Sequence, residues 1–315
     1  MIVTVTPNAA LDKTIQVPSM QIGMRHRGAR GLVAPGGKGI NVARALRIMQ
    51  EPVIATGLKG GETGSRIVRE LTLEGILNDF VTIEGESRSS TVLVDPTSGR
   101  QTEIIENGPS VTTAELERLL ERLEYLARDA YAVVLAGSLP RDVPEGWYAE
   151  AAKVVRRAGA QIVLDSEGDP LRQGVVAEPH LVAPNQREAE ELVGHEFSGD
   201  ADVVDALDEI ADMGARNVLI TTETGVAALL REGGQVRRFR VRAPRIDVLS
   251  TVGAGDALLA GYLSSRLRGG SPEEALLHGV ACGTASTLLA GAGMYDPREA
   301  KRQLADTKLL ELSLR

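Results

Sequence analysis

Cysteine is almost absent from this chain of 315 residues, because Cys282 is the only one. A single cysteine cannot build a disulfide framework, and its position between Ala281 and Gly283 is typical of a small buried residue. The four histidines are scattered along the chain and do not form the spaced pairs of a zinc site. These scarcities exclude a disulfide scaffold and a zinc-binding module.

The chain also lacks an excess of positive charge. Its formal net charge is −8 and its pI is about 5.3, which argues against a nucleic-acid or anionic-membrane partner, since both require a basic surface. No apolar run approaches the length that spans a bilayer. The N-terminus leads directly into a β-branched run at residues 2–6, without the basic segment and apolar core of a signal peptide. We therefore expect a soluble cytoplasmic protein.

The length permits a large core, because a chain of this size buries roughly three quarters of the surface of its unfolded form. After Pro109, short runs rich in Val, Ile and Leu alternate with helical patterns. Strands are expected at 132–136, 162–164, 181–183 and 218–221, helices at 112–128, 145–158 and from 186 and 202, and a hairpin at 232–234. This alternation predicts a parallel sheet covered on both faces by helices, with ligands beyond the carboxyl ends of its strands.

The first third of the chain adds polar strands to this pattern. We expect strands at 2–6 and 53–57, helices at 40–49 and 65–74, polar strands at 14–17 and 25–33, and a hairpin of 91–94 with 101–105. The polar strands are split in sequence and do not suit a sheet buried on both faces. The sequence thus predicts one α/β domain over residues 1–315, with a small β-sheet lid from about 12–34 and 88–106 inserted in it.

The most informative stretch is Ser250-Thr251-Val252-Gly253-Ala254-Gly255-Asp256, which precedes a long helical pattern of small residues. Glycines permit backbone conformations that cost other residues free energy, and they let a ligand approach the main chain. The amides of Gly253, Ala254 and Gly255 would open a helix N-terminus, which favours an anion such as phosphate. The turn is not a Walker A loop, and Leu258 stands where a dinucleotide-binding GxGxxG motif needs its third glycine.

Asp256 has two possible roles at this turn. It is a preferred residue near helix starts and is able to cap the helix. A carboxylate beside a phosphate cradle would repel the ligand, however, unless it has a chemical task such as accepting the proton of an attacking hydroxyl. General-base catalysis of this kind contributes about 10²- to 10⁴-fold in rate. The residues alone leave both roles open.

A second glycine-rich turn, Gly36-Gly37-Lys38-Gly39-Ile40-Asn41, also precedes a helical pattern. A plain turn into a helix explains its glycines as well as the close approach of a ligand does. Asn41 in the first helical turn is nevertheless able to bind a hydroxyl, and Asp12 reaches the same space. A carboxylate and an amide that face several hydroxyls are typical of sugar-binding pockets.

Asn185-Gln186-Arg187-Glu188 has the spacing of a capping box, in which Asn185 and Glu188 satisfy each other's backbone amides. The same pair suits Mg²⁺-bound water near phosphates, since Mg²⁺ keeps several waters and uses few carboxylates. The spacing does not decide between these two readings.

Four arginines lie on the predicted lid segments, namely Arg25, Arg27, Arg88 and Arg100. Most surface arginines are simply solvated. A set that converges over a sugar site would instead bind a phosphate group through paired hydrogen bonds. In that case the substrate would be a sugar phosphate.

Together these motifs resemble the PfkB group of the ribokinase superfamily, particularly its branch of 1-phosphofructokinases, tagatose-6-phosphate kinases and minor 6-phosphofructokinases. The resemblance covers nearly the whole chain, in seven motifs: 6–12, 36–43, 57–64, 101–109, 136–140, 185–188 and 250–256. It implies a Rossmann-like, ribokinase-like three-layer α/β fold with a small β-sheet lid. It also implies transfer of the ATP γ-phosphoryl group to a sugar hydroxyl, and a homodimer formed through the lid sheet.

The resemblance implies a role for individual residues of this chain. Asp256 would be the catalytic base, and the amides of Gly253, Ala254 and Gly255 its anion hole. The substrate would be bound by Asp12, Gly37, Gly39, Asn41 and Ser138, with Arg25, Arg27 and Arg88 at its phosphate. The nucleotide would contact Asn185, Thr221, Gly225, Gly253, Gly255 and Cys282. Glu188, and Asn185 indirectly through water, would hold Mg²⁺.

The sequence thus predicts a Mg²⁺- and ATP-dependent kinase that converts a ketohexose phosphate into a bisphosphate, with K⁺ as a further candidate ligand. Fructose 1-phosphate, fructose 6-phosphate and tagatose 6-phosphate all stay open, and residues 101–109 lean weakly towards the 6-phosphates. The alternatives are a kinase of an unphosphorylated sugar or nucleoside and a non-catalytic sugar-phosphate sensor. Retention of Asp256 argues against the sensor, because binding alone needs no base.

Overall fold

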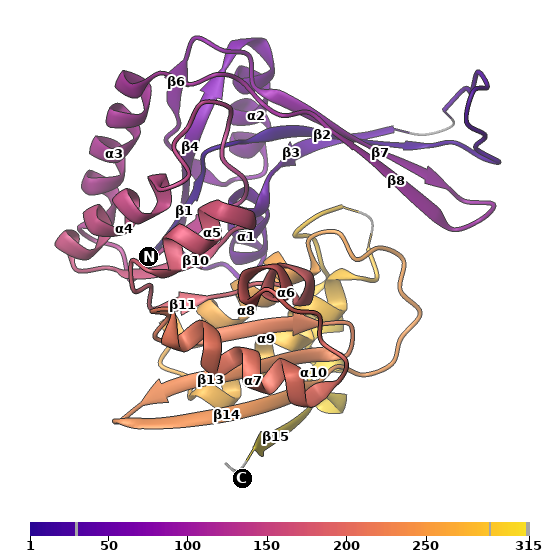
Figure 1. Ribbon diagram of the computed structural model, residues 1–315. Helices are drawn as coiled ribbons and strands as arrows, with labels where there is room; N and C mark the ends of the chain where they lie inside the picture. The colour runs from indigo at the N-terminus through magenta and orange to yellow at the C-terminus, as the bar shows by residue number, and fades with distance from the viewer. Residues whose placement is uncertain (29–30, 290, 313–315) are drawn as a thin grey trace.

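The computed structural model describes residues 1–28, 31–289 and 291–312 (Figure 1). Within these residues the main sheet has eleven strands, one of which, β6 (Val81–Ile83), pairs with β4 beside the continuous path. In spatial order the other strands are β15 (Lys308–Leu312), β14 (Gln235–Arg242), β13 (Gly225–Glu232), β12 (Val218–Thr222), β11 (Leu181–Val182), β10 (Gln161–Asp165), β9 (Ala132–Ala136), β1 (Ile2–Thr6), β4 (Val53–Gly60) and β5 (Leu77–Asn78).

The sheet is parallel from β12 to β5 and antiparallel from β12 to β15. The predicted parallel centre and the hairpin at 232–234 are therefore confirmed. The antiparallel pairing of β12, β13 and β14 has a local cause, because only short turns link β12 to β13 and β13 to β14, and a short turn can join only antiparallel neighbours. The loops after β1, β9, β10 and β11 all begin at the carboxyl ends of the parallel strands, which is the edge where ligands are predicted to bind.

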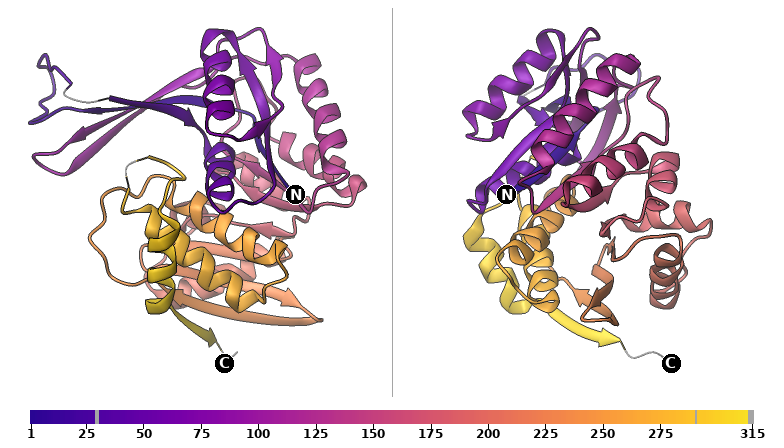
Figure 2. Two further views of the ribbon diagram at one scale, coloured as in Figure 1. Left: turned by 180° about the vertical axis from the view of Figure 1, so that it is seen from behind. Right: turned by 90° about the vertical axis from the view of Figure 1, so that its left-hand side faces the viewer.

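Helices cover both faces of this sheet, which makes three layers (Figure 2). One face packs against α1 (Lys38–Ile48), α2 (Gly61–Leu73), α8 (Ala254–Leu267), α9 (Pro272–Ser286) and α10 (Pro297–Asp306), the other against α3 (Thr113–Ala127), α4 (Trp147–Ala158), α5 (Gly168–Val175), α6 (Gln186–Val193) and α7 (Asp200–Asp212). Neighbouring strand residues alternate between the two cores. Val133 packs with the α3 to α7 layer and Val134 with the other layer, as the period of two requires. Among the described residues, none of the helices is both long and apolar enough to cross a bilayer.

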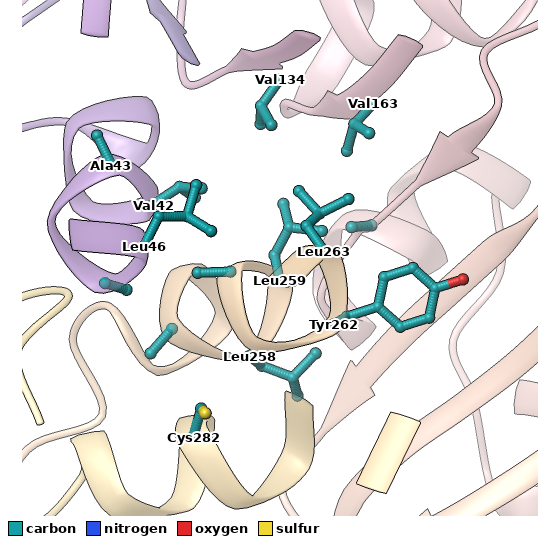
Figure 3. Packing of buried hydrophobic residues seen from close by; sticks show 14 of the residues in the cluster. Val42, Ala43, Leu46, Val134, Val163, Leu258, Leu259, Tyr262, Leu263 and Cys282 are labelled. Atoms are coloured by element: carbon teal, nitrogen blue, oxygen red, sulfur yellow. The ribbon is translucent and has the colours of Figure 1, made fainter. Parts of the chain in front are cut away.

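Helix α8 is enclosed on several sides, which fixes where its N-terminus lies. Leu259 and Leu263 point towards the sheet, whereas Leu258 points towards Cys282 on α9 (Figure 3). The two helices approach closely at Gly261, where an added Cβ would lie 2.9 Å from the Cys282 Sγ atom. A helix buried in this way holds its first turn in a constant position relative to the strand ends.

The predicted lid is a separate four-stranded sheet that projects from the main body (Figure 1). Its order is β3 (Gly31–Gly36), β2 (Ala10–Gln16), β7 (Arg88–Asp95) and β8 (Arg100–Ile105), so the predicted hairpin is confirmed. The predicted strand at 25–33 is wrong at its start, because residues 25–28 lie in an irregular exposed loop and residues 29–30 lie outside the described part. The segment before it, between β2 and Arg25, contains Ser19 and Gly23 at positive φ, which interrupts the extended backbone there.

Candidate active site

Helix α8 starts at Ala254, within the predicted glycine-rich turn. Its N-cap, Gly253, has φ 78°, and an added Cβ there would lie 2.6 Å from the Gly293 nitrogen. Gly255 is exposed, and a Cβ added to it would meet no described atom within 4 Å. The first-turn amides of a helix have no intrahelical acceptor. In this turn the Ala254 amide donates to the Thr251 carbonyl oxygen at 3.2 Å. The open space in front of Gly255 is compatible with the predicted anion cradle, which stays a prediction.

Asp256 is the third residue of α8 and is buried. Its Oδ2 atom accepts a hydrogen bond of 2.8 Å from Nδ2 of Asn41, in the first turn of α1. Burial is the largest cause that raises the pKa of Asp256 to about 7, and the neighbouring carboxylate of Asp165 adds to it. A carboxylate whose pKa lies near neutral pH suits a general base.

The turn before α1 has a packing explanation. A Cβ on Gly37 would lie 2.7 Å from Cγ2 of Thr6, and a Cβ on Gly39 would lie 2.9 Å from the Val5 carbonyl oxygen. Both glycines thus allow α1 to start directly against β1. The structure supports the structural reading of this turn and places only Asn41, among its predicted residues, beside the predicted base.

Asp12 lies on β2 at the base of the small sheet, and its carboxylate rests against Gly36. Burial raises the pKa of Asp12 to about 6, although the positive charges of Arg88 and Arg44 oppose this shift. Arg88 starts β7 and donates from Nε to the Asn8 carbonyl oxygen at 3.1 Å. Burial is also the main cause that lowers the pKa of Arg88, while Asp12 opposes that change. Asp12 and Arg88 therefore lie in one partly desolvated environment.

The remaining predicted substrate residues fall into two groups. Ser138 follows β9 and accepts a hydrogen bond of 3.2 Å from Nδ2 of Asn8, which places it beside the strand ends. Arg25 and Arg27 are exposed in the loop between β2 and β3, which occupies the outer end of the small sheet (Figure 1). Within one chain, the structure does not bring them to Asp256.

Asn185 and Glu188 form the predicted capping box at the start of α6. The Glu188 amide donates to Asn185 Oδ1, and the Asn185 amide donates to Glu188 Oε2, both at 2.9 Å. The other oxygen of Glu188, Oε1, accepts a hydrogen bond of 2.8 Å from Nζ of Lys38. The structural role is thus satisfied by one carboxylate oxygen, and the second faces the site.

Lys38 and Asp165 are site residues that the sequence reasoning missed. Nζ of Lys38 also donates to Oδ1 of Asp165 at 2.6 Å, so the ammonium group bridges two carboxylates. Burial would lower the pKa of Lys38, but these carboxylates raise it above its ordinary value. Burial raises the pKa of Asp165, and Lys38 opposes the shift. A signal was present, because Asp165 ends a buried strand, at the edge where parallel sheets bind ligands.

The donors around Lys38 fit a magnesium ion in one respect. Glu188 and Asp165 are two hard oxygen donors in a common environment, and Mg²⁺ is typically bound by one or two carboxylates together with waters and phosphates. Within the described residues there is no cluster of three or more His, Cys, Asp or Glu side chains suited to a metal. The protein would therefore supply only part of the coordination, with phosphate oxygens and water supplying the rest.

The predicted nucleotide residues beyond Asn185 differ in exposure. Thr221, near the end of β12, is partly exposed and pairs with Asn185 across a parallel bridge. Gly225 is buried with φ 137°, and an added Cβ would collide with the Val241 carbonyl oxygen. Cys282 is fully buried, and burial raises the pKa of its thiol to about 12. Packing thus explains both Gly225 and Cys282, and their contact with the nucleotide stays a prediction.

The chain is similar to known proteins over almost its whole length. The family model described as pfkB family carbohydrate kinase matches residues 8–298. A 1-phosphofructokinase of Borreliella burgdorferi is 32% identical over 312 residues, which is 99% of each chain. The structure of phosphofructokinase-2 of Escherichia coli in complex with potassium superposes with a TM-score of 0.89 at 27% identity, covering 97% of this chain and 98% of that one.

A further solved structure, a possible 1-phosphofructokinase of Thermotoga maritima, superposes with a TM-score of 0.89 at 27% identity. The superposition covers 99% of this chain and 100% of that one. The family match spans both glycine-rich turns, the Asn185 capping box and Asp256. The predicted resemblance is confirmed, including the ribokinase-like α/β fold. The chain belongs to the pfkB family of carbohydrate kinases, which are ATP-using phosphotransferases with an alcohol group as acceptor.

Proposed function

We propose that this protein is a Mg²⁺-dependent kinase that transfers the γ-phosphoryl group of ATP to a ketohexose phosphate and forms a bisphosphate. The observation that carries the proposal is the buried Asp256 carboxylate, which Asn41 contacts and whose pKa is about 7, at the open N-terminus of α8. A base and an anion cradle on one helical turn are what phosphoryl transfer to a hydroxyl requires.

In the proposed step Asp256 accepts the proton of the sugar hydroxyl, whose oxygen forms a bond to the γ-phosphorus. The bond between that phosphorus and the β–γ bridging oxygen breaks, and ADP leaves with the electron pair. The amides of Gly253, Ala254 and Gly255 stabilise the charge that develops on the transferred group. Catalysis of this type is mostly positioning and electrostatic stabilisation.

We assign the substrate phosphate to Arg88, with Arg25 and Arg27 as further contacts, and the sugar hydroxyls to Asp12, Asn41 and Ser138. The partly buried guanidinium of Arg88 supports this assignment, because a desolvated Arg binds a phosphate more strongly than an exposed one does. Arg88→Ala should raise the KM for the sugar phosphate at least about tenfold and change that for ATP little. Equal changes in both constants would remove Arg88 from the phosphate site.

We assign the nucleotide to Thr221, Asn185 and the Gly253 turn. When bound, Mg²⁺ neutralises phosphate charge, and Glu188, with Asn185 acting through water, would hold it beside Asp165. Lys38 would then be freed to interact with phosphate oxygens. The E. coli relative was solved with potassium, so K⁺ is a further candidate, tested by comparing activity in KCl and in tetramethylammonium chloride.

We also propose a homodimer formed through the small sheet. Leu32 on one edge strand of this sheet and Ile104 and Ile105 on the other are 46%, 56% and 61% exposed, and exposed apolar side chains on an open sheet are candidates for an interface. Light scattering should therefore give twice the chain mass, and Ile104→Lys should reduce it to one chain, whereas Leu73→Lys on α2 should leave it unchanged. A monomeric wild type would contradict this proposal.

The cytoplasmic location expected from the sequence also stays a prediction.

The decisive experiment measures ADP release with Mg-ATP and, in parallel, fructose 1-phosphate, fructose 6-phosphate, tagatose 6-phosphate, fructose and ribose. Strong turnover of one phosphorylated ketohexose is expected, and it would name the substrate. Activity on free sugars alone would overturn the phosphate assignment. Nucleotide binding without turnover of any of them would favour a sensor.

A further inference from the structure

Arg44 is a buried arginine next to the proposed active site. It lies in the second turn of α1, and 6% of its surface is exposed. Its Nη1 atom donates to Asn41 Oδ1 at 3.3 Å and to the Ala292 carbonyl oxygen at 3.0 Å. Its Nη2 atom donates to the Pro35 carbonyl oxygen at 2.8 Å, and Glu74 accepts from Nε at 2.7 Å. The guanidinium thus joins four separate segments of the chain.

The bond to Asn41 decides which way the side-chain amide of this residue points. An arginine can only donate hydrogen bonds, so the Asn41 oxygen must face Arg44. The Asn41 nitrogen must then face Asp256, where it donates to Oδ2 at 2.8 Å. This leaves the other carboxylate oxygen of Asp256 for the hydroxyl of a substrate. Without Arg44, the amide of Asn41 would be held only by its bond to the Asp256 carboxylate, which as an acceptor also favours the Asn41 nitrogen.

The bond to Ala292 links Arg44 to the anion cradle. A Cβ on Gly253 would lie 2.7 Å from Cα of Ala292, and a Cβ on Gly293 would lie 2.9 Å from Cα of Asn41. Residues 292 and 293 therefore fill the space between α1 and the turn that opens α8. Because Arg44 holds the Ala292 carbonyl, it also holds this packing in place.

The bond to Pro35 extends the connection to the small sheet. Pro35 lies near the end of β3, next to Gly36, against which the Asp12 carboxylate rests. Arg44 therefore contacts backbone or side-chain groups beside three proposed site features: the sugar-binding carboxylate of Asp12, the base Asp256 and the cradle at Gly253.

We propose that Arg44 is a positioning residue of the phosphoryl-transfer site, which orients the amide of Asn41 towards Asp256 and holds residues 292–293 against the Gly253 turn. The inference rests on the proposed function for its kinetic consequences. Its structural consequences do not depend on which substrate is used. It differs from a stabilising ion pair, because Glu74 satisfies the charge of Arg44 from outside the site.

The kinetic test compares Arg44→Met with Glu74→Gln. Arg44→Met removes all the donors, so kcat should fall about 10- to 100-fold, as expected when a reacting group is misplaced by about 1 Å, while the KM for ATP changes less than about threefold. Glu74→Gln keeps the bonds of Arg44 to Asn41, Ala292 and Pro35, so it should lower the melting temperature but leave kcat within about twofold. Arg44→Lys, with a single ammonium group, should recover only part of kcat.

A double-mutant cycle identifies the route of the effect. In an Asn41→Ala background, Arg44→Met should reduce kcat much less than in the wild type, because the amide that it orients is gone. Two results would overturn the proposal: kcat of Arg44→Met within twofold of wild type at a temperature where it is folded, or equal losses in Arg44→Met and Glu74→Gln. If Arg44→Met does not fold, Arg44→Lys carries the same comparison.

Hydrogen–deuterium exchange measured by mass spectrometry separates this inference from the proposed function, because it needs no substrate. Peptides that contain residues 291–295 and 250–256 should exchange at least about tenfold faster in Arg44→Met and at the wild-type rate in Glu74→Gln. Unchanged exchange in Arg44→Met would overturn the structural part. A wild type that phosphorylates no sugar phosphate would instead remove the proposed function and leave the exchange result standing.

Discussion

The turns before α1 and α8 share one pattern, two glycines separated by one residue, followed by a polar side chain in the first helical turn. At α1 both Gly37 and Gly39 are required by contact with β1. At α8 only Gly253 is required by contact within the protein, namely with residues 292 and 293, since Gly255 faces open space. This difference shows that a glycine pattern predicts close approach to the main chain but does not show whether protein atoms or a ligand come close. At α1 it is the protein's own strand, and at α8 we infer that it is the ligand.

The polar residues of the two turns complete each other. Asn41 from α1 donates to Asp256 from α8. The tightly packed turn therefore supplies the neutral group, held in place, and the open turn supplies the carboxylate that we propose as the base. Substitutions at the first turn should cost mainly stability, and those at the second mainly activity.

The largest expected effect is that of Asp256→Asn, which should lower kcat about 10²- to 10⁴-fold. The new side chain has the same shape and is still able to accept the hydrogen bond from Asn41, so the fold and nucleotide affinity should be kept. Turnover with the best sugar phosphate and ADP binding by calorimetry measure the two quantities. A variant that keeps at least half of the wild-type turnover would show that Asp256 is not the base.

The next effect tests the packed turn. Gly39→Ala places a methyl group against the Val5 carbonyl oxygen and should lower the free energy of unfolding by about 1–3 kcal/mol, the usual cost of overpacking. Urea denaturation followed by circular dichroism measures it. At temperatures where the variant is folded, its KM for ATP should stay close to that of the wild type. A fully stable Gly39→Ala with impaired sugar binding would instead assign this glycine to the ligand.

A smaller effect is expected for the open turn. Gly255→Ala should leave the free energy of unfolding unchanged or raise it by up to about 1 kcal/mol, since alanine favours helix and no atom opposes the new methyl. The same methyl would stand where the phosphates approach, so kcat/KM for ATP should fall about tenfold. Steady-state kinetics and urea denaturation decide between the outcomes. Full activity would show that no ligand comes close to Gly255.

Much of the fold was predictable, because its signals are local. The buried strands, the Asn185 capping box and the hairpin at 232–234 each lie within a short window, and the structure confirms them. Helix α5 was missed because Gly168, Pro170 and Gly174 obscure its helical pattern. The strand predicted from Arg25 was wrong at its start because residues 25–28 are irregular and exposed, which their residue types alone do not reveal.

The site was predictable only in part, because its contacts join distant positions. Asp256 and Asn41 were predicted separately, but 215 residues separate them, and no spacing rule shows that they meet. The bridge from Lys38 to Asp165 spans 127 residues and was missed altogether. Burial also depends on tertiary packing, so the raised pKa of Asp256 became apparent only with the structure.

The smallest expected effect is on the pH dependence of kcat, which we expect Asp256 in the first turn of α8 to determine. Because the base must be ionised, kcat should fall up to tenfold per unit as the pH drops below the pKa of Asp256, about 7, and should level off above pH 8. Burial is the main cause of the raised pKa, and Asp165 contributes next, so Asp165→Asn should move this acidic limb to lower pH by about half to one unit. Lys38 keeps its charge in this variant, and its attraction for the Asp256 carboxylate acts in the same direction. Pre-steady-state turnover at pH 5.5–8.5 measures the limb, and a shift to higher pH in Asp165→Asn would contradict the assignment of the limb to Asp256.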